Sequence, residues 1–263
     1  MKILIIGLEG ICPEALFDDE SLSNLRQLME LGCYGRIDSL TIPEGFSIWQ
    51  CLSASQLPTP SMQSEHIFGI WDHLQQKGQS VTHITISNTL DSPAGEDNQF
   101  LDHLYTESCD RFALARRHLQ NQECGHLQII DAGADILQSR LVGQAAPIKD
   151  FSIFLDEQIG SLFELLSDET VLLVLLACKV NNATESAFIL ASANNPLHAE
   201  INSANLLDLA PTLLQLAGED IPTSMQGKSL VAGIDLGQGF DTGLSQDEEE
   251  LLRERLSGLG YIN

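Results

Sequence analysis

The chain is poor in basic residues. It carries 13 lysines and arginines against 37 aspartates and glutamates, a formal net charge of −24 over 263 residues. A surface of this sign repels phosphate backbones and anionic membrane surfaces. We therefore expect neither a nucleic acid nor a membrane as a partner of this protein.

Long apolar runs are also missing. The opening MKILIIG is far too short for a signal peptide or a membrane helix, and no later segment reaches roughly 18 consecutive apolar residues. The 43% hydrophobic and 19% charged residues are ordinary values for a globular protein. We expect a soluble, cytoplasmic protein that forms a single domain over residues 1–263.

Cysteine motifs are absent although cysteines are present. The six cysteines are widely scattered and include no Cys-x-x-Cys pair: Cys12, Cys33, Cys51, Cys109, Cys124 and Cys178. Neither a zinc knot nor a disulfide framework is indicated by this spacing. We expect buried or surface thiols in a reducing compartment.

Several common catalytic signatures are missing too. The chain has no Gly-x-Ser-x-Gly elbow, no Walker-type phosphate loop and no Gly-x-Gly-x-x-Gly fingerprint. Most histidines stand singly in expected helices or strands, with neither His-x-His nor His-Glu-x-x-His spacing: His66, His73, His83, His103, His118 and His126. They are interpreted as surface or satisfied core histidines.

The sequence does contain a regular alternation of strand and helix patterns. Strands are expected at 2–6, 34–40, 81–86, 126–130, 170–176 and 187–191, and helices at 22–31, 46–54, 67–76, 98–120, 149–166, 204–216 and about 245–258. The continuous run VLLVLL is typical of a central strand that is buried on both faces. Pro211 predicts a kink or a restart within its helix. The predicted fold class is α/β, a three-layer αβα sandwich with a mostly parallel central sheet.

Segments spread over nearly the whole chain resemble the alkaline phosphatase superfamily, in its type I phosphodiesterase and nucleotide pyrophosphatase branch. They are, in order, MKILIIGLEG, residues 22–43, the helix around Trp49, residues 70–93, FALARRHLQNQECGHLQIIDAGADILQSRL, and NLLDLAPTLLQLAGEDIPTSMQGKSL with the tail EEELLRERLSGLGYIN. The resemblance implies an alkaline-phosphatase-like core. The long insertions that form caps in relatives are here cut to a few residues.

The resemblance also implies a two-metal site for phosphoryl transfer. In the family, one metal takes the opening Asp, a hydroxyl nucleophile, and the Asp and His of an Asp-His-Gly turn. The other takes the Asp and His of Asp-x-x-x-His and one late His. Two such ions, about 4 Å apart, stabilise the attacking and leaving oxygens. Zinc or manganese would suit these ligands.

Two positions of this site retain a usable side chain near the first strand and the nucleophile helix. Glu9 stands at the opening Asp, one methylene longer, and could equally be a solvated acid in a loop. Ser47 is the hydroxyl nearest the nucleophile position, although strict alignment equally places Phe46 or Gly45 there. A serine near the start of a helix is more often an N-cap, and we favour that interpretation.

The remaining positions of the predicted site offer fewer metal-binding side chains. Asp135 stands at the Asp of Asp-x-x-x-His, but Ser139 replaces the His, and a helix cap is the more ordinary role for Asp135. Ala177 and Cys178 stand where the Asp and His of Asp-His-Gly belong. Cys178 could ligate a metal only as a thiolate and is more typical of a core cysteine. Each metal would be left with about one protein ligand, whereas tight sites have three or four.

The sequence therefore predicts a pseudoenzyme with a binding or regulatory role and no cofactor. Its ligand would be a protein partner or a small anion at the start of the helix near Ser47. The first alternative is an active metal-dependent phosphodiesterase or phosphatase that uses Glu9, Ser47, Asp135 and Cys178 with zinc or manganese. The second is a structural subunit of an assembly, which predicts a broad apolar surface.

Overall fold

A seven-stranded sheet forms the centre of the molecule. The computed structural model describes residues 2–59, 67–85, 97–121, 125–181, 183–192 and 199–232. The strands are β1 (Lys2–Glu9), β2 (Cys33–Leu40), β3 (Val81–Thr85), β4 (His126–Asp131), β5 (Thr170–Val180), β6 (Ala183–Ser192) and β7 (Ala199–Ala204). They lie in the order β3-β4-β1-β5-β6-β2-β7. Only β6 runs antiparallel to its neighbours in this sheet, so the predicted mostly parallel sheet is confirmed.

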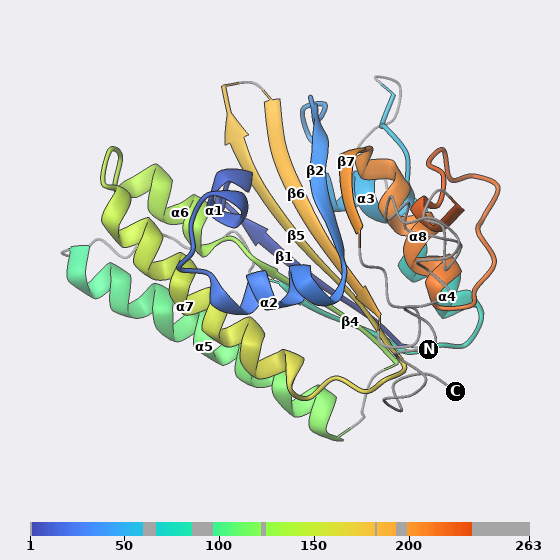
Figure 1. Cartoon of the computed structure of the whole chain (residues 1–263), viewed down its shortest axis with the longest axis horizontal. Helices are drawn as coiled ribbons and strands as arrows, with labels where there is room; N and C mark the ends of the chain where they lie inside the picture. The colour runs from blue at the N-terminus through green and yellow to red at the C-terminus, as the bar shows by residue number, and fades with distance from the viewer. Residues whose placement is uncertain are drawn as a thin grey trace, which may run out of the picture.

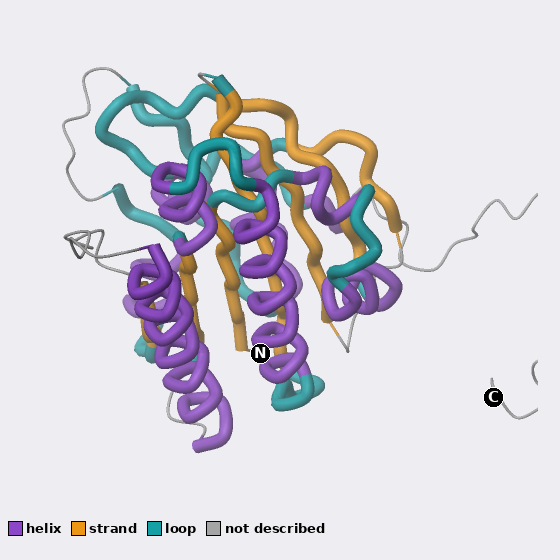
Figure 2. Tube along the Cα trace, turned by 90° about the vertical axis from the view of Figure 1, so that its left-hand side faces the viewer, coloured by secondary structure: helices purple, strands orange, loops and turns teal. Residues whose placement is uncertain are grey.

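Helices cover both faces of the sheet (Figures 1 and 2). One face carries α1 (Pro13–Phe17), α2 (Ser23–Leu31), α5 (Asp97–Asn121), α6 (Gly133–Arg140) and α7 (Ala145–Phe163). The other face carries α3 (Ile48–Ala54), α4 (Ile70–Gln76) and α8 (Leu209–Leu216), with the short 3₁₀ helices η1 (Leu206–Asp208) and η2 (Leu230–Ala232). The three-layer αβα sandwich predicted from the sequence is therefore confirmed.

Strand β5 shows why its sequence is apolar throughout. Leu172 and Val174 enter the core beneath α5 and α7, whereas Leu173 and Leu175 enter the core beneath α3, α4 and α8. Successive side chains of a strand point to opposite faces, so a strand covered on both faces needs apolar residues at every position. The prediction of a central, doubly buried strand is confirmed, since all four side chains are buried.

The differences from the predicted elements are small and have local reasons. The expected helix at 204–216 is divided into η1 and α8, with Pro211 in the first turn of α8, where a missing N–H is tolerated. Strand β7 and the five-residue α1 were not predicted, because AEINSA and PEALF are too short to show a period. The expected helix at 245–258 lies outside the described residues. In the part of the chain that the structure describes, no helix is long and apolar enough to cross a membrane.

The parallel strands bring three chain segments together at one edge, which we call the carboxyl edge. Strands β1, β4 and β5 are neighbours, and all three run toward it. Leu8 lies opposite Asp131 in the register, and Glu9 lies opposite Ala177. The carboxyl edge of an open α/β sheet is where ligands usually bind. The predicted site residues Glu9 and Cys178 both lie there.

Candidate functional site at the carboxyl edge

Glu9 is the last residue of β1, and its carboxylate is already bonded. The indole Nε1 of Trp49, from α3, donates a hydrogen bond to Glu9 Oε1. The two side chains can meet because Gly7 has no side chain, and a Cβ at that position would collide with the Trp49 ring. The expectation of a solvated acid in a loop was wrong, because Glu9 remains within the sheet and is partly buried.

The surroundings of Glu9 make its ionisation less favourable than in water. Burial raises its pKa above the ordinary glutamate value, and the nearby carboxylates of Asp135 and Asp131 raise it further. The hydrogen bond from Trp49 and the charge of Lys179 act in the opposite direction without cancelling the effect. The carboxyl edge therefore disfavours negative charge on Glu9 when no cation is present.

Ser47 is the N-cap of α3. Its Oγ accepts a hydrogen bond from the Gln50 backbone N–H at 3.2 Å, and the Gln50 side chain accepts one from the Ser47 N–H at 2.9 Å. This reciprocal arrangement is a capping box. The interpretation of Ser47 as an N-cap is confirmed.

Asp135 lies in the first turn of α6 but does not cap it. The N-cap residue is Ala132, which makes no side-chain cap bond, so the expected capping role of Asp135 was wrong. Ser139 donates its hydroxyl to the Ile136 carbonyl of its own helix at 2.7 Å. The start of α6 packs closely on Gly10, where a Cβ would collide with the Asp135 backbone. This contact brings Asp135 near Glu9.

The acid that is hydrogen-bonded to the start of this helix is Asp131, which the sequence analysis did not select. Asp131 is fully buried, and its Oδ1 accepts a hydrogen bond from the Gly133 N–H at 2.8 Å. Its Oδ2 is ion-paired with Arg111 of α5 and accepts a hydrogen bond from Ser108 Oγ at 2.7 Å. One signal was available, because Asp131 directly follows the residues HLQII of a mostly buried strand and ends that strand at the carboxyl edge.

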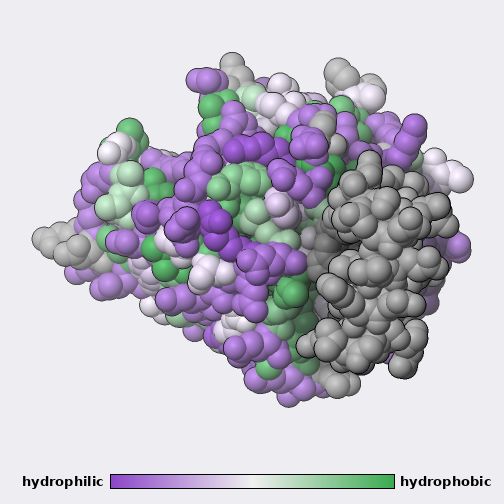
Figure 3. All heavy atoms as spheres, viewed as in Figure 1, coloured by the Kyte–Doolittle hydropathy of each residue, from purple (hydrophilic) through white to green (hydrophobic). Residues whose placement is uncertain are grey.

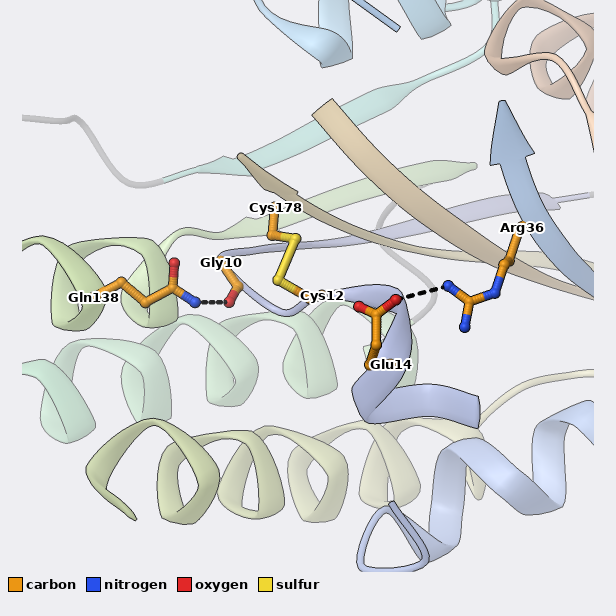
Figure 4. Close-up of a disulfide and its surroundings, with 6 residues drawn as sticks. All are labelled: Gly10, Cys12, Glu14, Arg36, Gln138 and Cys178. Atoms are coloured by element: carbon orange, nitrogen blue, oxygen red, sulfur yellow. Dashed lines mark hydrogen bonds and ion pairs between the residues drawn. A yellow bond between two sulfur atoms is a disulfide. The ribbon is translucent and has the colours of Figure 1, made fainter. Parts of the chain in front are cut away.

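Cys178 is joined to Cys12 by a disulfide, shown in Figure 4. The expectation of free thiols was therefore wrong for these two residues, and so was the suggestion of a Cys178 thiolate as a metal ligand. Cys12 follows β1 and Cys178 lies near the end of the neighbouring strand β5, so the fold brings together cysteines that are 166 residues apart. Gly10, beside them, accepts a hydrogen bond at its carbonyl from Gln138 of α6 at 2.6 Å.

The side chains at the carboxyl edge do not fit a two-metal centre. Glu9 is bonded to an indole, Ser47 is used in a cap and Cys178 is held in a disulfide. Within the described ranges, no group of three or more His, Cys, Asp or Glu side chains is arranged to hold a metal ion. A tight site normally supplies three or four protein ligands to each metal.

Sequence comparisons identify no family for this chain. No protein-family model matches it, and no curated protein shows significant similarity.

Solved structures, in contrast, match over most of the chain. A putative sulfatase from Bacteroides thetaiotaomicron superposes with a TM-score of 0.67 at 11% identity, covering 90% of this chain and 75% of that one. An alkaline phosphatase superfamily protein from Vibrio parahaemolyticus gives 0.62 at 16% identity, with 88% and 69% covered. Human ectonucleotide pyrophosphatase/phosphodiesterase 5 gives 0.61 at 9% identity, with 90% and 99% covered. The chain has the alkaline-phosphatase-like fold, as its sequence resemblance predicted.

Proposed function

We propose that this chain is a pseudoenzyme of the type I phosphodiesterase and nucleotide pyrophosphatase branch, which binds a ligand or partner without hydrolysing it. The proposal rests on the bonds that side chains at the predicted metal-ligand positions already make. Glu9 is bonded to Trp49, and Cys178 is bonded to Cys12. A metal at Glu9 would have to find further ligands that the described residues do not provide as a group of three or more.

The test is metal content combined with hydrolysis. The full chain is dialysed with zinc and manganese, desalted, and assayed by elemental analysis and with bis(p-nitrophenyl) phosphate. We expect no stoichiometric metal and no hydrolysis above that of a Glu9→Gln variant. About two ions per chain, with hydrolysis lost in that variant, would overturn the proposal.

One observation favours the alternative of an active, metal-dependent phosphoester or sulfate-ester hydrolase. The carboxylates of Asp131 and Asp135 both raise the pKa of Glu9, so both lie close enough to repel its negative charge. A divalent cation would relieve that repulsion. The alternative predicts that zinc or manganese protects the fold against heat, and that Asp135→Asn removes the protection.

The charge and the surface of the chain indicate what kind of partner it would bind. At the start of α3, the capping box already uses the N–H groups of Ser47 and Gln50, which leaves fewer donors for a small anion. A structural subunit would present a broad apolar surface, whereas hydrophilic residues predominate on the face in Figure 3, with smaller hydrophobic areas between them. A basic protein partner suits the charge of −24. It predicts association that weakens as salt is raised.

The cytoplasmic location predicted from the sequence remains part of this proposal, and the disulfide weighs against it. Disulfides persist mainly in oxidising compartments and are rare in reducing ones. A cytoplasmic protein would keep Cys12 and Cys178 reduced in the cell. Alkylation of thiols during rapid lysis, followed by mass spectrometry, distinguishes the two states.

A further inference from the structure

The two cysteines of the disulfide differ in their exposure to solvent. Cys12 is half-buried in the segment between β1 and α1, whereas Cys178 is 3% exposed within β5. Thiol–disulfide exchange begins when a thiolate attacks one of the two sulfurs, and access helps to decide which sulfur is attacked. The exposures therefore favour attack at Cys12.

A pocket of about 220 Å³, which we call the α1 pocket, lies beside Cys12. It is bordered by the segment between β1 and α1, the loop between α1 and α2, and the helices α6 and α7. Cys12 is one of its lining residues, and Cys178 is not. The volume is below the roughly 300–1,000 Å³ of sites for drug-sized ligands, so it suits a smaller molecule.

The charges in the α1 pocket are balanced. Asp19 and Lys149 are the two charged side chains among its lining residues, and they are ion-paired with each other at 2.9 Å. Apolar side chains such as Ile11, Leu22 and Ile148 form part of the remaining lining. A small, uncharged molecule suits these surroundings, whereas the net charge of −24 repels an anionic one.

Contacts other than the disulfide hold the two cysteines near each other. The Gly10 N–H, two residues before Cys12, donates to the Ala177 carbonyl, directly before Cys178, at 2.7 Å. On the other side of Cys12, Leu16 of α1 is fully buried in the core. Neither contact requires the S–S bond, so we expect the two thiols to stay adjacent after reduction. The disulfide can then form again.

We propose that Cys12 is a site of reversible modification by small, uncharged thiols, which enter the α1 pocket and open the disulfide. The thiolate attacks Cys12 Sγ and forms a mixed disulfide there, while the electrons of the broken bond leave on Cys178 Sγ, which takes a proton from water. The reverse reaction is attack of the Cys178 thiolate on Cys12 Sγ, which expels the small thiol.

Complete reduction needs a second molecule of thiol. Its thiolate attacks the modifier's sulfur in the mixed disulfide, a small disulfide is released, and Cys12 leaves as a thiolate that takes a proton. In total the protein disulfide gains two electrons and two protons, and two small thiols are oxidised to one small disulfide. This chemistry requires the disulfide and the pocket, and it does not depend on the proposed absence of hydrolysis.

Two variants of the full chain compare the two sulfurs. Cys178→Ser leaves the Cys12 thiol and Cys12→Ser leaves the Cys178 thiol, so both lose the same cross-link, and serine is a suitable N-cap for α1. Each is treated with bis(2-hydroxyethyl) disulfide, and mass spectrometry of peptides follows the adducts. We expect Cys12 to be modified roughly ten-fold faster than Cys178, or more. The exposed Cys109 is the internal standard in both variants.

The chain with all its cysteines provides a second test. Reduction by excess 2-mercaptoethanol is followed after acid quenching, and the transient adduct is expected on the peptide that contains Cys12. The rate should depend on which thiol is used, because the attack takes place on the folded protein. A limiting rate shared by 2-mercaptoethanol and dithiothreitol would instead mean that the protein must open before any thiol can attack.

A pair of neighbouring alanines in α7 tests the route through the α1 pocket. Ala145 lines the pocket, whereas Ala146 is exposed and does not. Ala145→Trp fills space beside Cys12, so reduction by 2-mercaptoethanol should become roughly five-fold slower or more. Ala146→Trp is the matched control and should leave the rate within about two-fold.

Three results would overturn the proposal. The first is modification of Cys178 as fast as that of Cys12 in the two cysteine variants. The second is the shared limiting rate of reduction, because the disulfide would then be closed to thiols in the folded chain. The third is the same rate of reduction in the Ala145→Trp and Ala146→Trp variants, which would exclude the α1 pocket as the route.

Discussion

Two regions of the molecule lie beside Trp49 and differ in how far their polar groups are satisfied. At the carboxyl edge, Glu9 is bonded to Trp49, Asp131 to Arg111 and Cys178 to Cys12. Beside the cavity between α3, α4 and β3–β4, the buried Trp71 N–H has no partner within the described residues.

The difference separates groups that stabilise the fold from one that does not. Buried polar groups with partners stabilise the fold, whereas a buried donor without a partner costs free energy. Breaking the contacts at the carboxyl edge is therefore expected to destabilise the protein most.

The largest expected effect comes from breaking the ion pair beneath the carboxyl edge. Arg111→Met leaves the buried Asp131 carboxylate without its cation, and we expect a loss of roughly 3–5 kcal/mol in the free energy of unfolding. Chemical denaturation at pH 7 measures this loss. Arg36→Met is the matched control, because the Arg36–Glu14 pair is exposed and its removal should cost at most about 1 kcal/mol.

Equal stability losses in these two variants would show that the Arg111–Asp131 pair does not organise the edge. The double variant Arg111→Met, Asp131→Asn adds a second check. It removes the unpaired charge, so we expect it to be less destabilised than Arg111→Met alone.

His126 and His83 lie on the neighbouring strands β4 and β3. His126 is 2% exposed, accepts the Ile3 N–H at Nδ1 and donates from Nε2 to the Gln79 side chain, whereas His83 borders the cavity. Burial lowers the pKa of His126 to about 4. In the unfolded chain His126 has a higher pKa and binds a proton more readily than in the folded chain. The stability that comes with a neutral, buried His126 is therefore fully present above pH 6.5 and is lost as the pH falls toward 4.

The loss from His126 over that range should amount to roughly 3 kcal/mol. Urea denaturation at pH 7 and pH 4.5 measures it against a His126→Asn variant, whose amide oxygen can replace Nδ1. The variant should lose less stability on acidification than the original chain. An identical pH dependence in both proteins would contradict the assignment of a neutral, buried His126.

The disulfide tests whether the carboxyl edge is held covalently. Reduction, or the variant Cys12→Ser with Cys178→Ser, should lower the free energy of unfolding by roughly 2–4 kcal/mol, since the cross-link restricts the unfolded chain. Cys109→Ser, at an exposed free cysteine, is the control and should change little. Alkylation should modify no more than four of the six cysteines before reduction. Modification of all six would mean that the bond is absent.

The smallest effect is expected at Glu9. Because burial and two neighbouring carboxylates raise its pKa, its charge opposes folding at neutral pH; this cost is absent below the ordinary glutamate pKa and develops as the pH rises through the raised one. Glu9→Gln keeps an acceptor for Trp49 and removes the charge. We expect a slightly higher melting temperature at pH 7 and none of this gain at pH 4. A lower melting temperature at pH 7 would show that the carboxylate is needed there.

The fold could be predicted largely from local patterns. The continuous run in β5 and the alternation of strands with helices predicted the layered sheet, and Ser47 with Gln50 contained the elements of a cap. The contacts at the carboxyl edge could not be predicted in the same way. The cysteines of the disulfide are 166 residues apart, and Arg111 meets Asp131 only because α5 packs under β4.

The cavity could not be predicted from sequence patterns either. Trp49 and Trp71 lie on separate helices, and the sequence gives no period or motif that relates them. Their shared border depends on how α3 and α4 pack against β3 and β4. Whether an indole N–H finds an acceptor depends on tertiary contacts within a few ångströms, which local propensity does not determine.

The most direct measurement follows the Trp49 indole N–H signal of the full chain in a ¹⁵N spectrum as zinc is added. The account predicts no saturable shift of this signal, because no group of described residues is arranged to hold a metal ion beside Glu9. A saturable zinc shift at Trp49 that is lost in Asp135→Asn would contradict the account and place a metal site at the carboxyl edge.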